Sequence, residues 1–393
     1  MKILVLNHNQ KGIGTYRRSF YFSRELSRHG HDVTMITVSR SQRFRPRTCY
    51  KTGWLGEATA VEGDGPRVRM IEAPALGYRW LPGWGSGPLD IGLRIAEVTR
   101  GGYDALYGFE YHPNVSWPVY ATKWWRAYRF YSDWCDWYAG IGNRFRDIEL
   151  AHRVDAFFEE RIRLIARKVT TNSSVLRDRA IGLGIPAERV VFIAEGADPE
   201  YIQPVDSQPA RARLGLTGDG PILGTVIDLY WRETLSVFSD VARQLPEVRL
   251  LVVGRRDRGL EEAVTRRGLQ DRVVLTGWVP DEAYPLWLGC ADVLVLVMKK
   301  DRYDLGRWPG KIGDYFAAGR ATVITDVGDA AAFAKAHRAA VVVPTIEDLP
   351  AAIVTLLETP SERAAYGQAA RAAAEGPLSW RALGGLMNDV VAS

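Results

Sequence analysis

Short runs of β-forming residues alternate with helical stretches along the whole chain. The first run, KILVLN (2–7), precedes a glycine-containing loop and a helical stretch in which apolar residues recur four apart from Tyr16 to Leu26. Gly30 ends that stretch, and DVTMITV (32–38) predicts the next strand. Further strands are expected over 67–73, 104–109, 128–133, 167–172 and 189–195. Such near-continuous apolar runs between helices indicate a parallel sheet covered on both faces.

A stretch rich in proline and glycine divides the chain into two halves. Residues 203–221 lack a strand period and predict a linker. A second series of apolar runs follows over 222–227, 248–254, 272–277, 292–298, 321–325 and 339–344. We therefore predict an α/β protein with two Rossmann-like, doubly wound parallel-sheet domains, 1–203 and 204–377. The helical tail, about 378–393, is expected to pack back on the first domain.

The composition is that of a globular protein with more than one core. At 393 residues the chain exceeds what a single core usually serves, and 47% of its residues are hydrophobic and 25% charged. No apolar run of about eighteen residues occurs, and the opening residues become polar too soon for a signal peptide. The cysteines, Cys49, Cys135 and Cys290, match no metal or redox spacing. We therefore expect a cytoplasmic protein without disulfides.

The charge balance favours an anionic partner. A net charge of +5 and a pI near 9.0 suit nucleic acid, an anionic membrane surface or a phosphorylated ligand. Arginine is scattered, and no zinc-finger spacing or aromatic RNA-binding signature occurs, which argues against nucleic acid. The stretch 123–140 places tryptophans beside arginines, a combination that suits sugar stacking, a membrane interface or core packing. A peripheral contact at the inner membrane face is therefore an additional expectation.

The stretch WPGKIGDYFAAGRATVITDVG (308–328) carries the most specific candidate chemistry. Pro309 and Gly310 suit a helix start, and Lys311 and Asp314 then share one helix face. A helix N-terminus reinforced by a lysine can hold a phosphate, and a carboxylate one turn later can accept hydrogen bonds from a sugar diol. The pair therefore suits a nucleoside diphosphate. A surface ion pair three residues apart is the alternative.

The chain resembles the GT-B glycosyltransferases, and within them the retaining enzymes of glycosyltransferase family four. The resemblance covers nearly the whole chain and rests on KILVLNHNQKGIGTYRR (2–18), VVLTGWVPDEAYPLWLGCADVLVLV (273–297) and PGKIGDYFAAGRATVITDVG (309–328). It implies a nucleotide-sugar donor held by the second domain, an acceptor held by the first, and transfer with retention across a cleft. It also implies no metal and no cofactor beyond the nucleotide sugar, in agreement with the lack of an Asp-x-Asp pair.

The resemblance assigns donor-binding residues in the second half. Asp314 stands at the second glutamate of the paired-glutamate motif of the family, which binds the ribose, and Lys311 matches a lysine found in a subset of members. The first glutamate falls on Gly306, so that the nearby Asp304 or Asp301 is expected to replace it; the alternative is that backbone groups of DLGRWPGK (304–311) hold the donor sugar. Arg232 lies where the family places a basic residue against the diphosphate. A solvated arginine at a helix start is the alternative for Arg232, and weaker candidates for that role are Arg255 and Arg256.

In the first half, candidates follow three predicted strands. Gly12 and Gly14 open the first helix and can bring backbone close to the donor, or form a plain tight turn. His112, in the loop after 104–109, is expected at the donor sugar, with Glu110 as the other polar contact; a structural histidine is the alternative. Asp133, the last residue of 128–133, and Asp136, just after it, are candidate acceptor ligands together with Glu110. The alternative is that the two aspartates are helix caps.

These residues predict a retaining, hexosyltransferase-type enzyme that uses a nucleoside-diphosphate sugar. Lys311, Arg232 and the helix N-terminus are expected to stabilise the departing diphosphate, with His112 as the third catalytic candidate. The acceptor is expected to be a sugar, a lipid-linked compound or another small molecule. A nucleotide-sugar 2-epimerase is the first rival, although the sequence shows no cluster of carboxylates. A catalytically silent nucleotide-sugar-binding subunit is the second, because of Gly306.

Overall fold

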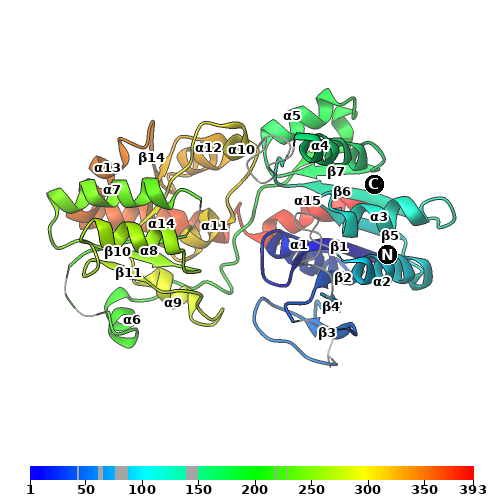
Figure 1. Ribbon diagram of the computed structural model, residues 1–393, viewed down its shortest axis with the longest axis horizontal. Coiled ribbons are helices and arrows are strands. Elements are labelled where there is room, and N and C mark those ends of the chain that lie inside the picture. The colour runs from blue at the N-terminus through cyan, green and yellow to red at the C-terminus, as the bar shows by residue number, and fades with distance from the viewer. Residues whose placement is uncertain are drawn as a thin grey trace. The chain divides into compact units, whose positions relative to one another are not determined.

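The computed structural model describes residues 1–41, 44–60, 65–75, 87–138, 149–216, 218, 220–227 and 229–393. The chain forms two compact units. The first comprises 1–195, 305–308 and 380–393, and the second comprises 196–304 and 309–379. Both are parallel-sheet α/β units, so the predicted fold class is confirmed (Figure 1).

The first unit contains an eight-stranded sheet in the order β3-β4-β2-β1-β5-β6-β7-β8. All neighbours pair in parallel except β3 with β4. The strands are β1 (Lys2–Gln10), β2 (Asp32–Val38), β3 (Arg47–Lys51), β4 (Val68–Ala73), β5 (Ala105–Phe109), β6 (Arg129–Trp134), β7 (Lys168–Thr171) and β8 (Val190–Phe192). Its helices are α1 (Tyr16–Arg28), α2 (Pro88–Gly101), α3 (Pro113–Thr122), α4 (Glu149–Leu164), α5 (Ser174–Gly182), the short 3-10 helix η2 (Ala187–Arg189) and α15 (Trp380–Ala392).

Alternate residues of β1 serve two cores on opposite faces of this sheet. Ile3 and Val5 lie in one core, with apolar residues of α1 and α15. Leu4 and Leu6 lie in the other, which α2 to α5 cover. The tail belongs to this unit through α15, which packs beside α1 (Figure 1). There the buried ring of Trp380 stacks on that of Tyr21 at 5.1 Å.

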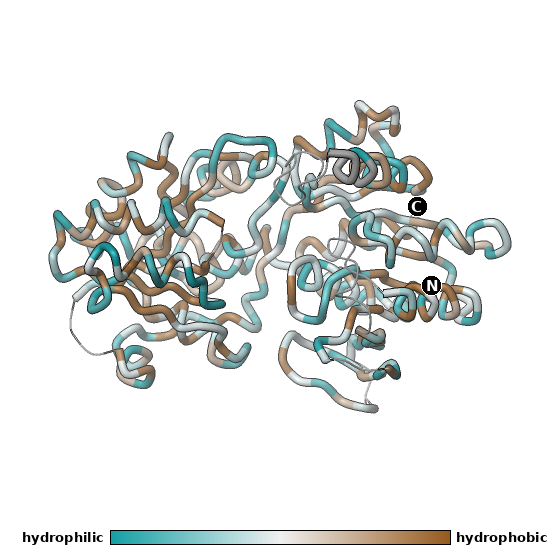
Figure 2. Tube along the Cα trace, in the orientation of Figure 1, coloured by the Kyte–Doolittle hydropathy of each residue, from teal (hydrophilic) through white to brown (hydrophobic). Residues whose placement is uncertain are grey.

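The second unit contains a parallel sheet in the order β11-β10-β9-β12-β13-β14. Its strands are β9 (Ile222–Val226), β10 (Arg249–Val253), β11 (Val273–Leu275), β12 (Val293–Leu296), β13 (Ala321–Thr325) and β14 (Val341–Val343). Its helices are α6 (Ser207–Arg213), α7 (Trp231–Gln244), α8 (Arg258–Arg266), α9 (Tyr284–Gly289), α10 (Arg302–Leu305), α11 (Gly310–Ala317), α12 (Gly328–Ala336), α13 (Leu349–Glu358) and α14 (Pro360–Glu375). Hydrophobic residues follow the strands of this unit (Figure 2).

Strand order places a ligand-binding edge in each unit. In an open α/β sheet, ligands bind outside the carboxyl ends of strands, where the order reverses direction. That reversal lies between β1 and β5 in the first unit and between β9 and β12 in the second. Two local features differ from the expectations. The stretch 203–221 contains helix α6, and the antiparallel strand β3 was not predicted. Among the described helices, none has both the length and the apolarity of a membrane span.

Candidate active site

The reversal point of the first sheet carries two stacked histidines. His8 lies near the end of β1, and His112 is the N-cap of α3, directly after β5. Their rings are parallel within 1° and their centroids are 3.9 Å apart. Pro113 at the first helical position begins α3 here, and the His112 carbonyl accepts the backbone N–H groups of Val115 and Ser116. The strand order thus joins residues 104 positions apart in the chain.

Aromatic rings surround His112 on its other sides. The ring of Tyr111 stacks on it at 4.8 Å, and the ring of Tyr138 meets it edge-on at 5.3 Å. His112 itself is half-buried, whereas His8 is buried. The imidazole predicted to contact the donor sugar therefore sits in an aromatic enclosure with part of its surface accessible.

Glu110 is an internal ligand of the first unit. Its side chain is fully buried, one oxygen accepts from Arg163 at 3.1 Å, and the other accepts from the backbone N–H groups of Cys135 and Asp136. Its φ of 67° lies in the left-handed region, which is uncommon for a residue other than glycine. Both carboxylate oxygens are engaged, which favours a role for Glu110 in holding the loops after β5 and β6 rather than direct acceptor contact.

Asp133 is likewise engaged within the protein. Arg18 of α1 donates to both of its oxygens, at 2.9 and 3.0 Å, and the hydroxyl of Thr170 donates to the second oxygen at 2.6 Å. Arg18 also donates to the carbonyls of Ile193 and Ala194 and pairs with Glu195 at 3.3 Å. A single buried guanidinium therefore joins α1, β6 and the segment after β8.

The carboxylates of the first unit form a coupled group. Burial raises the pKa of Asp136 to about 7, with Glu110 adding to the rise and Arg307 opposing it. Burial also raises the pKa of Glu195 to about 7, against the opposing effect of Arg18. Asp133 acts on both groups. From the sequence we expected no cluster of carboxylates in the folded protein, and that expectation was wrong. The parallel strands bring carboxylates from distant parts of the chain to one sheet edge.

The two glycines of the first loop adopt left-handed backbone conformations, with φ of 76° at Gly12 and 55° at Gly14. A Cβ atom at Gly12 would lie 2.6 Å from the Arg40 guanidinium, and one at Gly14 would lie 2.2 Å from the Asn9 amide. Both glycines are therefore required by the protein's own turn.

In the second unit, helix α11 begins at Gly310, as predicted. Its Lys311 ammonium donates to the carbonyls of Val226 and Ile227, at 2.9 and 2.8 Å, and so lies at the carboxyl end of β9. Asp314 is buried, and one of its oxygens accepts from the Tyr284 hydroxyl at 3.0 Å. Lys311 and Asp314 thus reach two different elements, β9 and α9.

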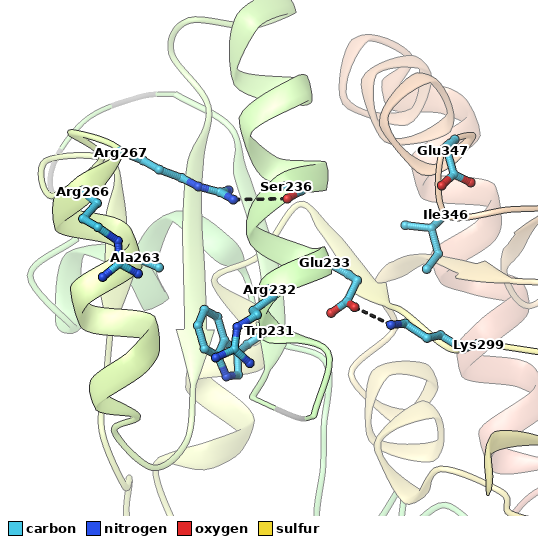
Figure 3. Close-up of a pocket in the computed structure, with 10 residues that line it drawn as sticks. All are labelled: Trp231, Arg232, Glu233, Ser236, Ala263, Arg266, Arg267, Lys299, Ile346 and Glu347. Atoms are coloured by element: carbon cyan, nitrogen blue, oxygen red, sulfur yellow. Dashed lines mark hydrogen bonds and ion pairs between the residues drawn. The ribbon is translucent and has the colours of Figure 1, made fainter. Parts of the chain in front are cut away.

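A hollow of about 690 Å³ lies beside the start of α7 (Figure 3). Arg232 is exposed there, with its guanidinium 4.3 Å from the Trp231 ring, and Lys299, which follows β12, pairs with Glu233. The lining residues are Trp231, Arg232, Glu233, Ser236, Ala263, Arg266, Arg267, Lys299, Ile346 and Glu347. Four cations against two carboxylates make this hollow basic.

Asp304, the predicted replacement for the missing glutamate, is fully buried. One of its oxygens accepts from the Lys299 backbone N–H at 2.6 Å, and its own N–H donates to the Asp301 carboxylate at 2.9 Å. This geometry fixes the turn after β12, and therefore the position of Lys299 in the hollow.

Sequence reasoning missed four side chains of the first unit: His8, Arg18, Arg163 and Glu195. Arg18 carries a usable signal, because it lies among the core residues Tyr16, Phe20 and Phe22 of one helix. A charge on an apolar helix face needs a buried partner. His8 carries no comparable signal.

Comparisons with known proteins agree with this architecture. Residues 11–196 match the model of a glycosyl transferase 4-like domain, and residues 220–359 match that of glycosyl transferases group 1. An MMP alpha-(1->4)-mannosyltransferase from Mycolicibacterium hassiacum is 23% identical over 98% of this chain and 96% of its own. A 2-deoxystreptamine glucosyltransferase from Streptomyces kanamyceticus is 30% identical over 28% of this chain, and the match spans only 31% of that relative.

The fold itself is shared with solved structures. A sucrose-phosphate synthase from Thermosynechococcus elongatus superposes with a TM-score of 0.76 at 18% identity, covering 100% of this chain and 98% of that one. The two family models lie in the same order as the two sheets. The chain therefore belongs to the GT-B glycosyltransferases, with a glycosyl transferase 4-like domain followed by a domain of glycosyl transferases group 1.

Proposed function

We propose that this protein transfers a hexose from a nucleoside-diphosphate sugar to an acceptor hydroxyl with retention of configuration. The observation that carries the proposal is the set of cations at the reversal point of the second sheet. Lys311 lies at the end of β9, Arg232 lies at the start of α7, and Lys299 follows β12. A diphosphate is the leaving group that such cations stabilise.

Donor binding follows from the same unit. Arg232 is exposed and already oriented by the Trp231 ring, so it is available to a phosphate without breaking an internal ion pair. Asp314 is the proposed ligand of the ribose diol, and its bond to Tyr284 holds the carboxylate in place. Gly12 and Gly14 are proposed to leave room for the donor near the first sheet.

The proposed reaction needs no enzyme nucleophile. The bond between the anomeric carbon and the diphosphate oxygen breaks, the acceptor oxygen bonds to that carbon on the same face, and the hydroxyl proton passes to a phosphate oxygen. His112 is proposed to contact the donor sugar as positive charge develops at the anomeric carbon. Asp136 is the proposed acceptor ligand, because it is half-buried whereas Glu110 and Asp133 are fully buried.

Metal-independent transfer without another cofactor is part of the proposal. Among the described residues, two groups offer potential ligand atoms within 4.8 Å, and they are Cys49, Glu57 and Glu72, and Glu110, Cys135 and Asp136. Glu72 pairs with Lys11, and Glu110 pairs with Arg163. Burial raises the pKa of Cys135 well above its usual range, so its thiol stays protonated and a poor ligand. We expect a chelator to leave turnover unchanged.

The test is donor turnover. A thermal-shift screen of nucleotides and nucleotide sugars identifies the donor, because a ligand at about 100 times its Kd adds about 2.7 kcal/mol of stability. Release of nucleoside diphosphate is then followed with and without sugar acceptors, and NMR of the product anomeric proton reports configuration. Acceptor-dependent release with retention supports the proposal. An epimerase would rearrange the donor alone, and a silent subunit would bind it without turnover.

A contact with an anionic membrane surface is a second proposal, favoured by the end of α3. Trp124, Trp125 and Trp117 expose 82%, 60% and 51% of their surface. Lys123 and Arg126 flank this exposed tryptophan cluster, and the Lys123 ammonium lies 5.1 Å from the Trp124 ring. The adjoining hollow contains cations and no acidic residue, with Lys123, Arg129, Arg167 and Arg189 in its lining. Exposed tryptophans with cations suit the interface of an anionic bilayer.

Co-sedimentation with vesicles tests this second proposal. We expect binding to vesicles that contain phosphatidylglycerol and none to pure phosphatidylcholine. The double variant Trp124→Ser/Trp125→Ser should lose binding, whereas Trp278→Ser, a tryptophan of the second unit that is also 60% exposed, should keep it. The contact would be refuted if all three proteins sedimented equally, or if wild type sedimented with neither kind of vesicle.

A further inference from the structure

We propose that His8 is a positioning residue that fixes the ring plane of His112. The inference rests on the proposed function, because it assigns His8 a part in presenting His112 to the donor sugar. Two observations support it, the parallel stack and the way in which His8 is itself held.

The stack leaves His112 little freedom to turn. Rings parallel within 1° at 3.9 Å are in face-to-face contact, and the backbone of His112 is fixed as the N-cap of α3. Tyr111 and Tyr138 contact the imidazole from other directions. Removal of the His8 ring would open a space of one imidazole beside His112, and the χ angles of His112 could then change.

His8 is held more firmly than a surface side chain would be. Its ring is buried, and its Nδ1 lies 3.2 Å from the Thr15 hydroxyl. Its backbone carbonyl accepts from the Asn114 amide at 3.2 Å. The loop after β1 therefore locates the ring of His8, and helix α3 locates its backbone.

The charges around the stack keep His8 neutral. Burial lowers the pKa of His8 well below its usual value, and the Coulombic effects of His112, Arg94 and Arg163 lower it further. The nearby carboxylate of Asp90 is committed to Arg94 and to the Asn114 amide. Tyr138 also stays neutral, because burial raises its pKa well above its usual range. His8 therefore provides a flat neutral face to the His112 ring.

The test compares His8→Ala, which removes the ring, with His8→Phe, which keeps a flat ring without nitrogen atoms. We expect His8→Ala to lower kcat at least tenfold with donor KM changed less than twofold, and His8→Phe to stay within threefold of wild type. The His112 ring resonances in NMR should lose their ring-current shift in His8→Ala and keep one in His8→Phe. His29→Ala, at an exposed histidine, is the control for both measurements.

The outcomes separate this inference from the proposed function. Unchanged His112 resonances in His8→Ala would overturn the positioning role, whatever the activity. A lower melting temperature in both variants with kcat preserved in both would also overturn it, because His8 would then only support the fold. If wild type turns over no nucleotide sugar, the proposed function fails, while the resonances still decide whether His8 orients His112.

Discussion

The candidate sites at the sheet edges of the two units handle charge in opposite ways. In the first unit, Arg18 and Arg163 expose 1% and 0% of their side chains, and each is paired with carboxylates and backbone carbonyls. In the second unit, Arg232 is exposed on an aromatic ring in a hollow with surplus positive charge. Charges that are satisfied internally hold a shape, whereas exposed cations are available to an anion from outside.

Under the proposed function, this difference matches a division of work between the two units. A diphosphate brings its own negative charge, so the unit that binds it benefits from cations that the protein leaves accessible. An acceptor hydroxyl is neutral, and it requires oriented groups more than net charge. The buried ion pairs of the first unit provide orientation, because Arg18 joins α1, β6 and the segment after β8, and Arg163 joins α4 to the residue after β5.

Among the changes that test this comparison, Arg18→Met is expected to have the largest effect on stability. Loss of the guanidinium leaves Asp133 and Glu195 buried without their cation, and breaking a buried pair in this way costs about 3–5 kcal/mol. Urea denaturation measures the loss. Arg256→Met, whose pair with Glu261 is exposed, is the matched control and should change stability by about 0.5 kcal/mol or less. Equal losses in both variants would contradict the contrast between the units.

The next effect concerns two cations of the second unit, the exposed Arg232 and the half-buried Lys311. Arg232→Ala and Lys311→Ala should each weaken nucleoside-diphosphate binding by about 1.5–3 kcal/mol, the range for hydrogen bonds to charged groups, and should lower turnover. The bare nucleoside should bind as before, because both residues are assigned to phosphates only. Calorimetry measures the affinities. Arg258→Ala, an exposed arginine that begins α8, serves as control, and a variant with wild-type affinity loses its assignment.

A smaller effect is expected at Asp314. Asp314→Asn keeps the shape but removes the charge that would hold the ribose hydroxyls, so the affinity for the nucleoside itself should fall by about 1–3 kcal/mol. Tyr284→Phe removes only the hydroxyl that donates to this carboxylate and should have a lesser effect. Calorimetry with the nucleoside and the diphosphate distinguishes this residue from the cations. Unchanged nucleoside affinity in Asp314→Asn would refute the ribose contact.

A last prediction sharpens the comparison through pH. The ordinary pKa values of Asp136 and Glu195, 3.8 and 4.5, rise to about 7 in the folded state. The folded protein therefore binds more protons than the unfolded chain between these values, and the free energy of unfolding decreases as pH rises from about 4 to 7. Asp136→Asn/Glu195→Gln should flatten that slope in denaturation series at several pH values. A wild-type slope in the double variant would contradict the assignment.

Much of the fold was predictable because it depends on local patterns. The apolar runs predicted the strands of both parallel sheets, and Pro309 and Gly310 predicted the start of α11. Strand β3 was not predicted. Its residues, RTCYK, pair with β4 in the antiparallel direction, and this pairing between strands leaves no local pattern in the sequence. Helix α6 was not predicted, because the proline and glycine residues of 203–221 led us to interpret the whole stretch as a linker.

The sequence by itself determined the elements, the family resemblance and the residue types available for chemistry. Only the tertiary structure decided which of them meet. His8 stacks on His112, and Arg18 joins Asp133 to Glu195, because parallel pairing sets β1 beside β5, β6 beside β7, and β7 beside β8. The order of strands results from long-range pairing and burial, and no local period in the sequence encodes it. The same packing turned Glu110 and Asp133, predicted acceptor ligands, toward internal arginines.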